Sequence, residues 1–548
     1  MLALIGVRLT VGAEPRSMAD VLSIAHSAMG RTRAAASGDM QLLTFHPAYY
    51  IANAADEGGF VIVSADDRFT PVLGYCSQGN IRNEADMPDA LRYWLGVLTR
   101  EMSAAEEAGY QKCDAAASRR KSAESAALWQ ESIAPLVTTK WAQTTPYNNL
   151  IPTFATGCVA TATAQVMKFW NYPEHGTGQH TNSFFTDYSA DFGTTTYDWA
   201  NMKDEYGGKR DTKAEVAAVA TLMYHLGVAT DMRWTTNNSA TPNMYAAYAL
   251  VTFFGYNRNL HSETRDHLSP QAWKEMLLQQ LSTGHPLCYA GMTSETSSEG
   301  HFFVCDGYDA QTDRFHFNWG WGGRYDGYYA LSALDPLAQD EVGALTGSFN
   351  YCQQIFVDVQ PTLTGSYVAR FDCERVYPFT MSSPKDAVTF RTVNLTNNAL
   401  LFEGSVGLAI YAADGQLCQY VPSTQTFPGP LSIGKTNSGD YDVSVNLSDV
   451  ADGTYTVCLA VQDYNHPGTP YAIRAFYGNA TYYEMTVRGS QTSFKPLNSD
   501  DVNVGVASLR QHVPAYESAY NLSGRRIPSG EGKAKGIYVA NGRKFIKN

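Results

Sequence analysis

The sequence has nine cysteines among 548 residues, yet no two of them stand at C-x-x-C spacing. Zinc ribbons and thioredoxin-type redox motifs use such pairs, so neither class is supported. No apolar run approaches the roughly 18 residues that a membrane-spanning helix needs, and no transmembrane segment is expected. Charged residues make up only 17%, and the net charge is −13. An acidic chain without a dense Lys/Arg stripe is a poor candidate for binding nucleic acid, so no nucleic-acid partner is expected.

Apolar and aromatic residues are plentiful. Hydrophobic residues account for 44% of the chain and aromatic residues for 12%. This composition excludes a disordered chain and favours β-rich domains and grooves lined by aromatic rings. At about 150 residues per domain, the length suggests three or four domains. Most of the cysteines are interpreted as small, buried apolar residues.

The N-terminal part divides into two predicted segments. Residues 1–13 are apolar and are interpreted as a truncated signal peptide, although Arg8 interrupts them and a basic start is missing. An ordinary apolar start is the alternative. Residues 14–135 form a first unit, with a helix over 20–29, a strand over 60–64 and a helix over 91–102. A polar connector of small and charged residues follows.

The rest of the chain changes character twice. Residues 136–360 begin with helical patterns and end with strands, which predicts an α+β domain. Residues 361–495 read as alternating strands separated by turns, typical of an immunoglobulin-like β-sandwich. Residues 500–548 form a tail in which Asn541-Gly542 predicts a final hairpin.

Cys158 is the first candidate for chemistry. It follows Gly157, which permits a sharp turn and leaves room for a substrate, and it opens a run of helix formers. Unpaired N–H groups and the helix dipole at that position favour an anion, so the pKa of the thiol is expected to fall. The same N–H groups are suited to stabilising an oxyanion. A buried structural cysteine is the alternative.

His301 strengthens the catalytic interpretation. It starts an apolar strand 143 residues after Cys158, within the separation of a papain-like Cys/His pair. Asn318 follows 17 residues later, and its amide is predicted to fix the tautomer of the imidazole. The neighbouring indole of Trp319 is expected to shield that hydrogen bond from water. Together these residues predict nucleophilic catalysis by cysteine.

Longer blocks around these residues make the pattern specific. They are Gln143–Asn149, Ala155–Pro173, His301–Tyr308 and Asn318–Tyr329. With these blocks, the chain resembles the streptopain family of papain-like cysteine peptidases over about residues 135–360. The resemblance implies a two-lobed papain-like fold, with Cys158 as the nucleophile and His301 as the general acid/base. It also implies an inhibitory propeptide before residue 110, because Gly59–Arg68 matches such zymogens.

The resemblance also suggests further site residues. Gln143, 15 residues before Cys158, is assigned to the oxyanion hole. Gly157, Gly300 and Trp321 are assigned to the substrate cleft. Ala290 stands where these enzymes can carry a glutamine, and it is expected to widen an apolar pocket that selects a hydrophobic residue just upstream of the scissile bond.

The predicted function is therefore a secreted or surface-located cysteine endopeptidase, made as a latent zymogen and acting on proteins or peptides. Its own propeptide is the expected intramolecular inhibitor, and neither a cofactor nor a metal is expected. The tail resembles sorting domains of cargo exported by Bacteroidetes-type bacteria, with a last hairpin of the sandwich as the alternative. The alternative function is an adhesin or pseudoenzyme whose sandwich binds host or matrix partners. His225, on an apolar helix, is interpreted as a packed core residue.

Overall fold

The computed structural model describes most of the chain. The described residues are 14–30, 40–107, 110, 131–207, 210–236, 239–292, 300–333, 353–361, 369–398, 402–425, 436–464, 470–498, 519–521, 526–527, 536–540 and 543–547. The predicted signal peptide and nearly all of the polar connector lie outside these residues. No helix within the described ranges is long and apolar enough to cross a membrane.

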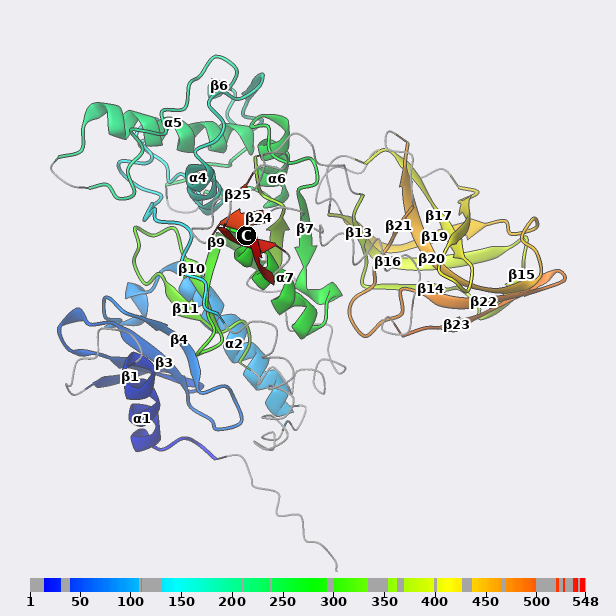
Figure 1. Ribbon diagram of the computed structural model, residues 1–548, viewed down its shortest axis with the longest axis horizontal. Coiled ribbons are helices and arrows are strands. Elements are labelled where there is room, and N and C mark those ends of the chain that lie inside the picture. The colour runs from blue at the N-terminus through cyan, green and yellow to red at the C-terminus, as the bar shows by residue number, and fades with distance from the viewer. Residues whose placement is uncertain are drawn as a thin grey trace, which may run out of the picture.

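One ten-stranded sheet runs through the N-terminal unit and the middle unit (Figure 1). Its order is β1-β2-β3-β4-β11-β10-β9-β8-β12-β7. The strands are β1 (Gln41–His46), β2 (Tyr49–Asn53), β3 (Phe60–Ser64), β4 (Val72–Cys76), β7 (His261–Thr264), β8 (Leu287–Met292), β9 (Gly300–Asp309), β10 (Arg314–Asn318), β11 (Gly327–Tyr329) and β12 (Gln354–Val357). The predicted N-terminal unit thus continues the sheet of the middle unit, which sequence patterns alone did not reveal.

Helices cover both faces of this sheet. On one face, α2 (Asp89–Glu107) and α7 (Pro270–Ser282) share a hydrophobic core with the strands. On the other face, α4 (Cys158–Trp170), α5 (Lys213–Ala229) and α6 (Met244–Thr252) form a second core. The short helix α1 (Met18–Met29) packs on the N-terminal strands. The helical lobe and the sheet lobe give the predicted α+β fold.

Helix α2 is anchored in the sheet lobe by Trp94. The indole is fully buried, and its Nε1 donates a hydrogen bond to the carbonyl of Ala330 at 2.9 Å. Its ring meets those of Tyr289, Phe303 and Phe317 edge-on. Because burying an aromatic ring contributes a few kcal/mol, about 2–3 by area, this contact fixes α2 against β8, β9 and β10.

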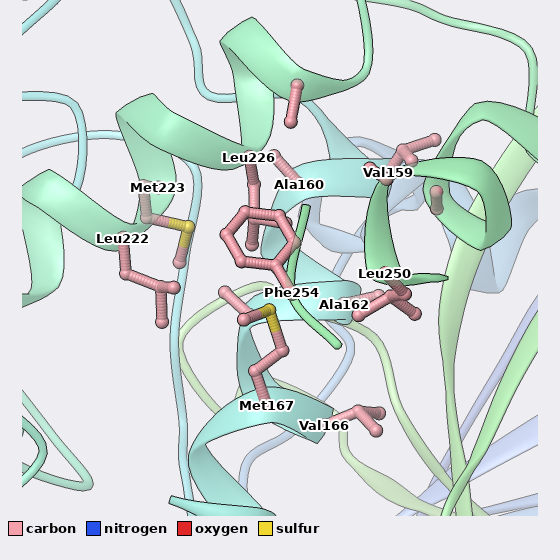
Figure 2. Packing of buried hydrophobic residues seen from close by; sticks show 14 of the residues in the cluster. Val159, Ala160, Ala162, Val166, Met167, Leu222, Met223, Leu226, Leu250 and Phe254 are labelled. Atoms are coloured by element: carbon pink, nitrogen blue, oxygen red, sulfur yellow. The ribbon is translucent and has the colours of Figure 1, made fainter. Parts of the chain in front are cut away.

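Helix α4 is buried because small residues let its neighbours approach closely. Ala160, Ala162 and Val166 are fully or almost fully inaccessible and pack against α5 and α6, as Figure 2 shows. From α5, Leu222 and Leu226 complete the contact. This packing fixes the helix whose first residue is Cys158.

The C-terminal unit is all-β, as predicted. One of its sheets has the order β13-β16-β14 with β19 beside β16, and the other has the order β15-β23-β22-β20-β17-β18 with β21 beside β20. The bounds are β13 (Phe371–Asp372), β14 (Arg375–Pro378), β15 (Ser382–Pro384), β16 (Val388–Asn397), β17 (Gly404–Tyr411), β18 (Leu417–Pro422), β19 (Thr436–Val445), β20 (Gly453–Asp463), β21 (Tyr471–Ala472), β22 (Tyr483–Arg488) and β23 (Gln491–Pro496). Both sheets contribute to one hydrophobic core, which makes the unit a sandwich.

Several smaller predictions are also confirmed. His225 is 7% exposed, and its Nδ1 lies 2.9 Å from the Tyr197 hydroxyl. Burial lowers the pKa of this imidazole to about 4. In the tail, β26 (Gly536–Ala540) pairs antiparallel with β27 (Arg543–Lys547), as the hairpin prediction required. Seven of the nine cysteines are described, all as free thiols, and five of these are buried.

Candidate active site

Gly157 sets the entry into α4 and so the position of Cys158. Its φ of 91° lies in the left-handed region, which glycine adopts without strain. A side chain there would also place a Cβ only 2.8 Å from the sulfur of Met232. The predicted sharp turn is therefore present, and close packing adds a second reason for glycine.

A single cavity of about 2050 Å³ brings the predicted residues together. Five of the nine predicted site residues line it: Gln143, Cys158, Gly300, His301 and Trp321. The opposite wall comes from α2, which contributes Asp89, Arg92, Tyr93, Gly96 and Arg100. The N-terminal unit therefore lies over the residues that are predicted to perform catalysis.

Cys158 and His301 do not form a hydrogen-bonded pair in this structure. Among the described residues, the thiol instead interacts with the backbone N–H groups of Phe302, Val159 and Cys158 itself. Burial raises the pKa of the thiol, and these N–H groups only partly oppose the shift. The predicted lowering of this pKa by the helix N-terminus is thus wrong for this state, because desolvation outweighs the N–H groups.

His301 is held among groups of the N-terminal unit. Its ring centroid lies 6.0 Å from that of Tyr93 on α2. Burial, with a smaller contribution from the charge of Arg92, lowers the pKa of the imidazole to about 4. At neutral pH the thiol and the imidazole are therefore both uncharged, and the thiolate–imidazolium pair is not formed.

Asn318 and Trp319 are not among the described residues that line the cavity, and their roles beside His301 stay predictions. The Asn318 Oδ1 accepts hydrogen bonds from Gln165 Nε2 at 3.1 Å and from the Gly320 N–H at 3.0 Å. Its Nδ2 donates to the carbonyl of Thr139 at 2.7 Å. Trp319 is 1% exposed and belongs to the sheet core. In this structure Asn318 joins the two lobes.

The pocket role of Ala290 also stays a prediction. It is fully buried in the helical core, and the residues that line the cavity do not include it. Successive residues of a strand face opposite sides, so the next residue of β8, Gly291, faces α2. An added Cβ at Gly291 would lie 2.3 Å from the Tyr93 hydroxyl oxygen. The alternation of side-chain directions along β8 is visible in the sequence, and it indicates Gly291 rather than Ala290 as the residue that faces Tyr93.

Gln143 is brought to Cys158 by the loop between them. Its carbonyl accepts a hydrogen bond from the Thr156 N–H at 3.0 Å. This contact brings Gln143 close to Cys158 although 15 residues separate them in the sequence. The half-buried side chain of Gln143 lies on the same cavity as the thiol. This position agrees with an oxyanion-binding role.

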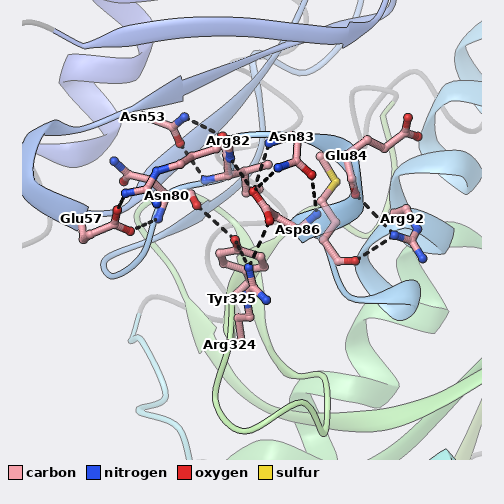
Figure 3. A network of polar contacts seen from close by, with 12 residues as sticks. Asn53, Glu57, Asn80, Arg82, Asn83, Glu84, Asp86, Arg92, Arg324 and Tyr325 are labelled. Carbon is pink, nitrogen blue, oxygen red and sulfur yellow. Dashed lines mark hydrogen bonds and ion pairs between the residues drawn. The ribbon is translucent and has the colours of Figure 1, made fainter. Parts of the chain in front are cut away.

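A polar network that sequence reasoning missed also joins the N-terminal and middle units (Figure 3). The Tyr325 hydroxyl donates to the carbonyl of Asn80 at 3.0 Å, and Arg324 forms an ion pair with Asp86 at 3.6 Å. Trp321 and Arg324, which precede Tyr325, both line the cavity, so the network attaches this part of the cavity wall to the N-terminal unit.

Comparisons with known proteins agree with this arrangement. The Peptidase C10 family model matches residues 141–329, and the model of the Spi protease inhibitor matches residues 26–102. These ranges cover the candidate active site and the unit that lies over it, respectively.

Individual relatives are similar to more than half of this chain. Streptopain of Streptococcus pyogenes is 32% identical over 339 residues, which cover 57% of this chain and 80% of streptopain. The thiol protease/hemagglutinin PrtT of Porphyromonas gingivalis is 32% identical over 332 residues, but the match spans only 37% of PrtT. A solved fragment of prointerpain A from Prevotella intermedia is 33% identical, with 59% of this chain and 99% of the fragment covered and a TM-score of 0.49.

The raised thiol pKa generates a first prediction. Because the thiolate is the reactive species, we expect Cys158 in the intact chain to react with iodoacetamide at pH 7 at least about tenfold more slowly than after removal of residues 14–135. The rate in the intact chain is expected to rise with pH beyond the ordinary thiol range. Mass spectrometry of the labelled peptide measures the reaction rate of Cys158. The Cys158→Ala variant shows how much label the exposed Cys418 takes up. Equal rates in both forms would contradict the assignment.

Proposed function

The chain belongs to the peptidase C10 family of cysteine peptidases and carries a Spi-type inhibitor domain; from this premise we propose that it is an endopeptidase made as a latent zymogen. The observation that carries the proposal is the cavity shared by Cys158 and His301 under the cover of α2. An adhesin or pseudoenzyme would not require both groups, so their presence favours the enzyme.

The reaction follows from the residues around the cavity. The thiolate of Cys158 attacks the carbonyl carbon of the scissile bond, and the oxyanion is stabilised by the Cys158 N–H and the Gln143 side chain. His301 gives its proton to the leaving amine, which departs and leaves a thioester. His301 then takes a proton from water, whose oxygen attacks the thioester; the acid is released and the Cys158 sulfur leaves as thiolate, which restores the starting pair with protonated His301.

Latency follows from the position of α2. Tyr93 occupies the space over Gly291, next to His301, and the N-terminal unit keeps the imidazole from pairing with the thiol. Removing this unit opens the cleft and exposes both groups to water, so desolvation no longer opposes the charged pair. We place the cleavage between about residues 113 and 137, in or next to the polar connector, with autocatalysis contributing.

Incubation of the purified chain tests catalysis and latency together. We expect the wild type to be trimmed within residues 113–137 and then to hydrolyse casein. Cys158→Ala and His301→Ala are expected to stay whole and to lose more than about 1000-fold in kcat/KM, because the pair acts as a unit. Cys418→Ala, which removes an exposed thiol of the sandwich, is the matched control and keeps full activity. Full activity of the uncut wild type would refute latency, and inactivity of the trimmed wild type would favour the adhesin.

We also propose that the enzyme acts outside the cell and that the tail directs its export. The hairpin of β26 and β27 and the basic residues of the tail support a recognition role. Deleting residues 506–548 is expected to leave peptidase activity in cell extracts and to abolish its appearance in the medium. Normal secretion of the shortened chain would reject this role.

A further inference from the structure

The catalytic cavity does not end at the peptidase domain. The same continuous space that is lined by Cys158 and His301 reaches the C-terminal sandwich. The sandwich residues on its wall include Asp372, Glu374, Asn394, Asn398, Ser438 and Phe476. At about 2050 Å³ the cavity exceeds the range of about 300–1,000 Å³ that is usual for small-molecule sites.

Backbone hydrogen bonds hold the sandwich against the edge of the large sheet. The N–H of Ser262 on β7 donates to the carbonyl of Asn398 at 3.0 Å. Further along, the N–H of Tyr477 donates to the carbonyl of Asp266 at 2.7 Å. Strand β7 ends the sheet order, so the sandwich covers an edge that would otherwise be open.

A buried ionic network secures the same junction. Glu263 on β7 is 1% exposed, and its carboxylate lies 2.9 Å from Arg370 and 2.8 Å from Arg474 of the sandwich. Burial opposes ionisation, but the two guanidinium groups hold the pKa of Glu263 well below its usual value. Arg474 also pairs with Asp372 at 2.7 Å. Breaking such a buried network is strongly unfavourable, so the sandwich wall keeps a fixed position relative to Cys158.

The sandwich wall carries the carboxylate of Glu374, whose position depends on an irregularity in β16. Asn394 stands at a break in the pairing register of β16 and has a φ of 52°. Such bulges redirect a side chain, and here the amide of Asn394 donates to the carboxylate of Glu374 and accepts from the Gly439 N–H at 2.7 Å. Asn394 therefore holds Glu374 in place at the cavity.

The charges on the two sides of the cavity are complementary. No described sandwich residue on its wall is basic, whereas Glu374 is acidic, as is Asp372, whose charge Arg474 already pairs. The helix that covers the cleft in the latent form brings Arg92 and Arg100 to the same cavity, together with Asp89, which pairs with Arg92. When the N-terminal unit leaves, the net positive charge of these three α2 side chains leaves with it, and Glu374 remains on the sandwich wall.

From these observations we propose that the sandwich extends the substrate cleft and binds a basic segment of the polypeptide substrate at a distance from the scissile bond. Glu374 is the specificity-determining residue, and Asn394 positions it. The inference rests on the proposed peptidase function and assigns the C-terminal unit a direct part in selecting substrates.

Fluorogenic peptides of different length test the inference. A short peptide covers only the residues beside the scissile bond. Longer peptides carry an extension of about ten residues at one end or the other, enough to span roughly 30 Å. Each extension is rich either in Lys/Arg or in Glu. With the trimmed enzyme, we expect one of the basic extensions to raise kcat/KM about fivefold over the acidic extension at the same end. Glu374→Gln is expected to abolish this preference, and Glu374→Lys to reverse it.

The controls separate the possible failures. Hydrolysis of the short peptide is expected to stay within about twofold in both Glu374 variants, because they do not touch the reacting groups. Glu403→Gln changes an exposed carboxylate of the sandwich that is not on the cavity wall, and it is expected to keep the preference. Equal rates for basic and acidic extensions, or a preference that survives in Glu374→Gln, would overturn the inference. Failure of the wild type to cleave even the short peptide would overturn the proposed function, and the inference with it.

Discussion

The pairing of β4 with β11 is the contact on which the latent structure depends. Tyr75 lies opposite Tyr328, and Gly74 lies opposite Tyr329. Gly74 has no Cβ, which would lie 2.3 Å from the Tyr329 ring, so the two strands approach closely only with glycine at this position. This junction makes the inhibitory unit and the peptidase one sheet, and it sets where α2 crosses the cleft.

The chemical state of the site follows from that junction. With α2 over the cleft, burial raises the pKa of the Cys158 thiol and lowers that of His301 to about 4. Neither group carries the charge that nucleophilic attack requires, and the two are not hydrogen-bonded. A helix N-terminus alone therefore does not activate the thiol, because water and the imidazole must first have access to it. Latency is in this sense an electrostatic consequence of packing.

Sequence reasoning was accurate where the signal was local. The helix at Cys158, the strand at His301 and the hairpin near the end of the chain all follow from periodicity and turn chemistry. It was less informative where the outcome depends on which side a residue faces or on a distant partner. Ala290 and Trp319 are buried because neighbouring elements cover them, and the β4–β11 pairing joins segments about 250 residues apart. For β8, the alternation of side-chain directions predicts that Ala290 and Gly291 face opposite sides of the sheet.

The central claim is that the docked inhibitory unit keeps His301 from Cys158. A crystal structure of the trimmed enzyme, residues 136–548, tests it most directly. The account predicts that a ring nitrogen of His301 lies within about 3.5 Å of the Cys158 sulfur once α2 is gone, close enough for a hydrogen bond. An active trimmed enzyme in which the two side chains remain unpaired, as in the latent structure, would contradict it.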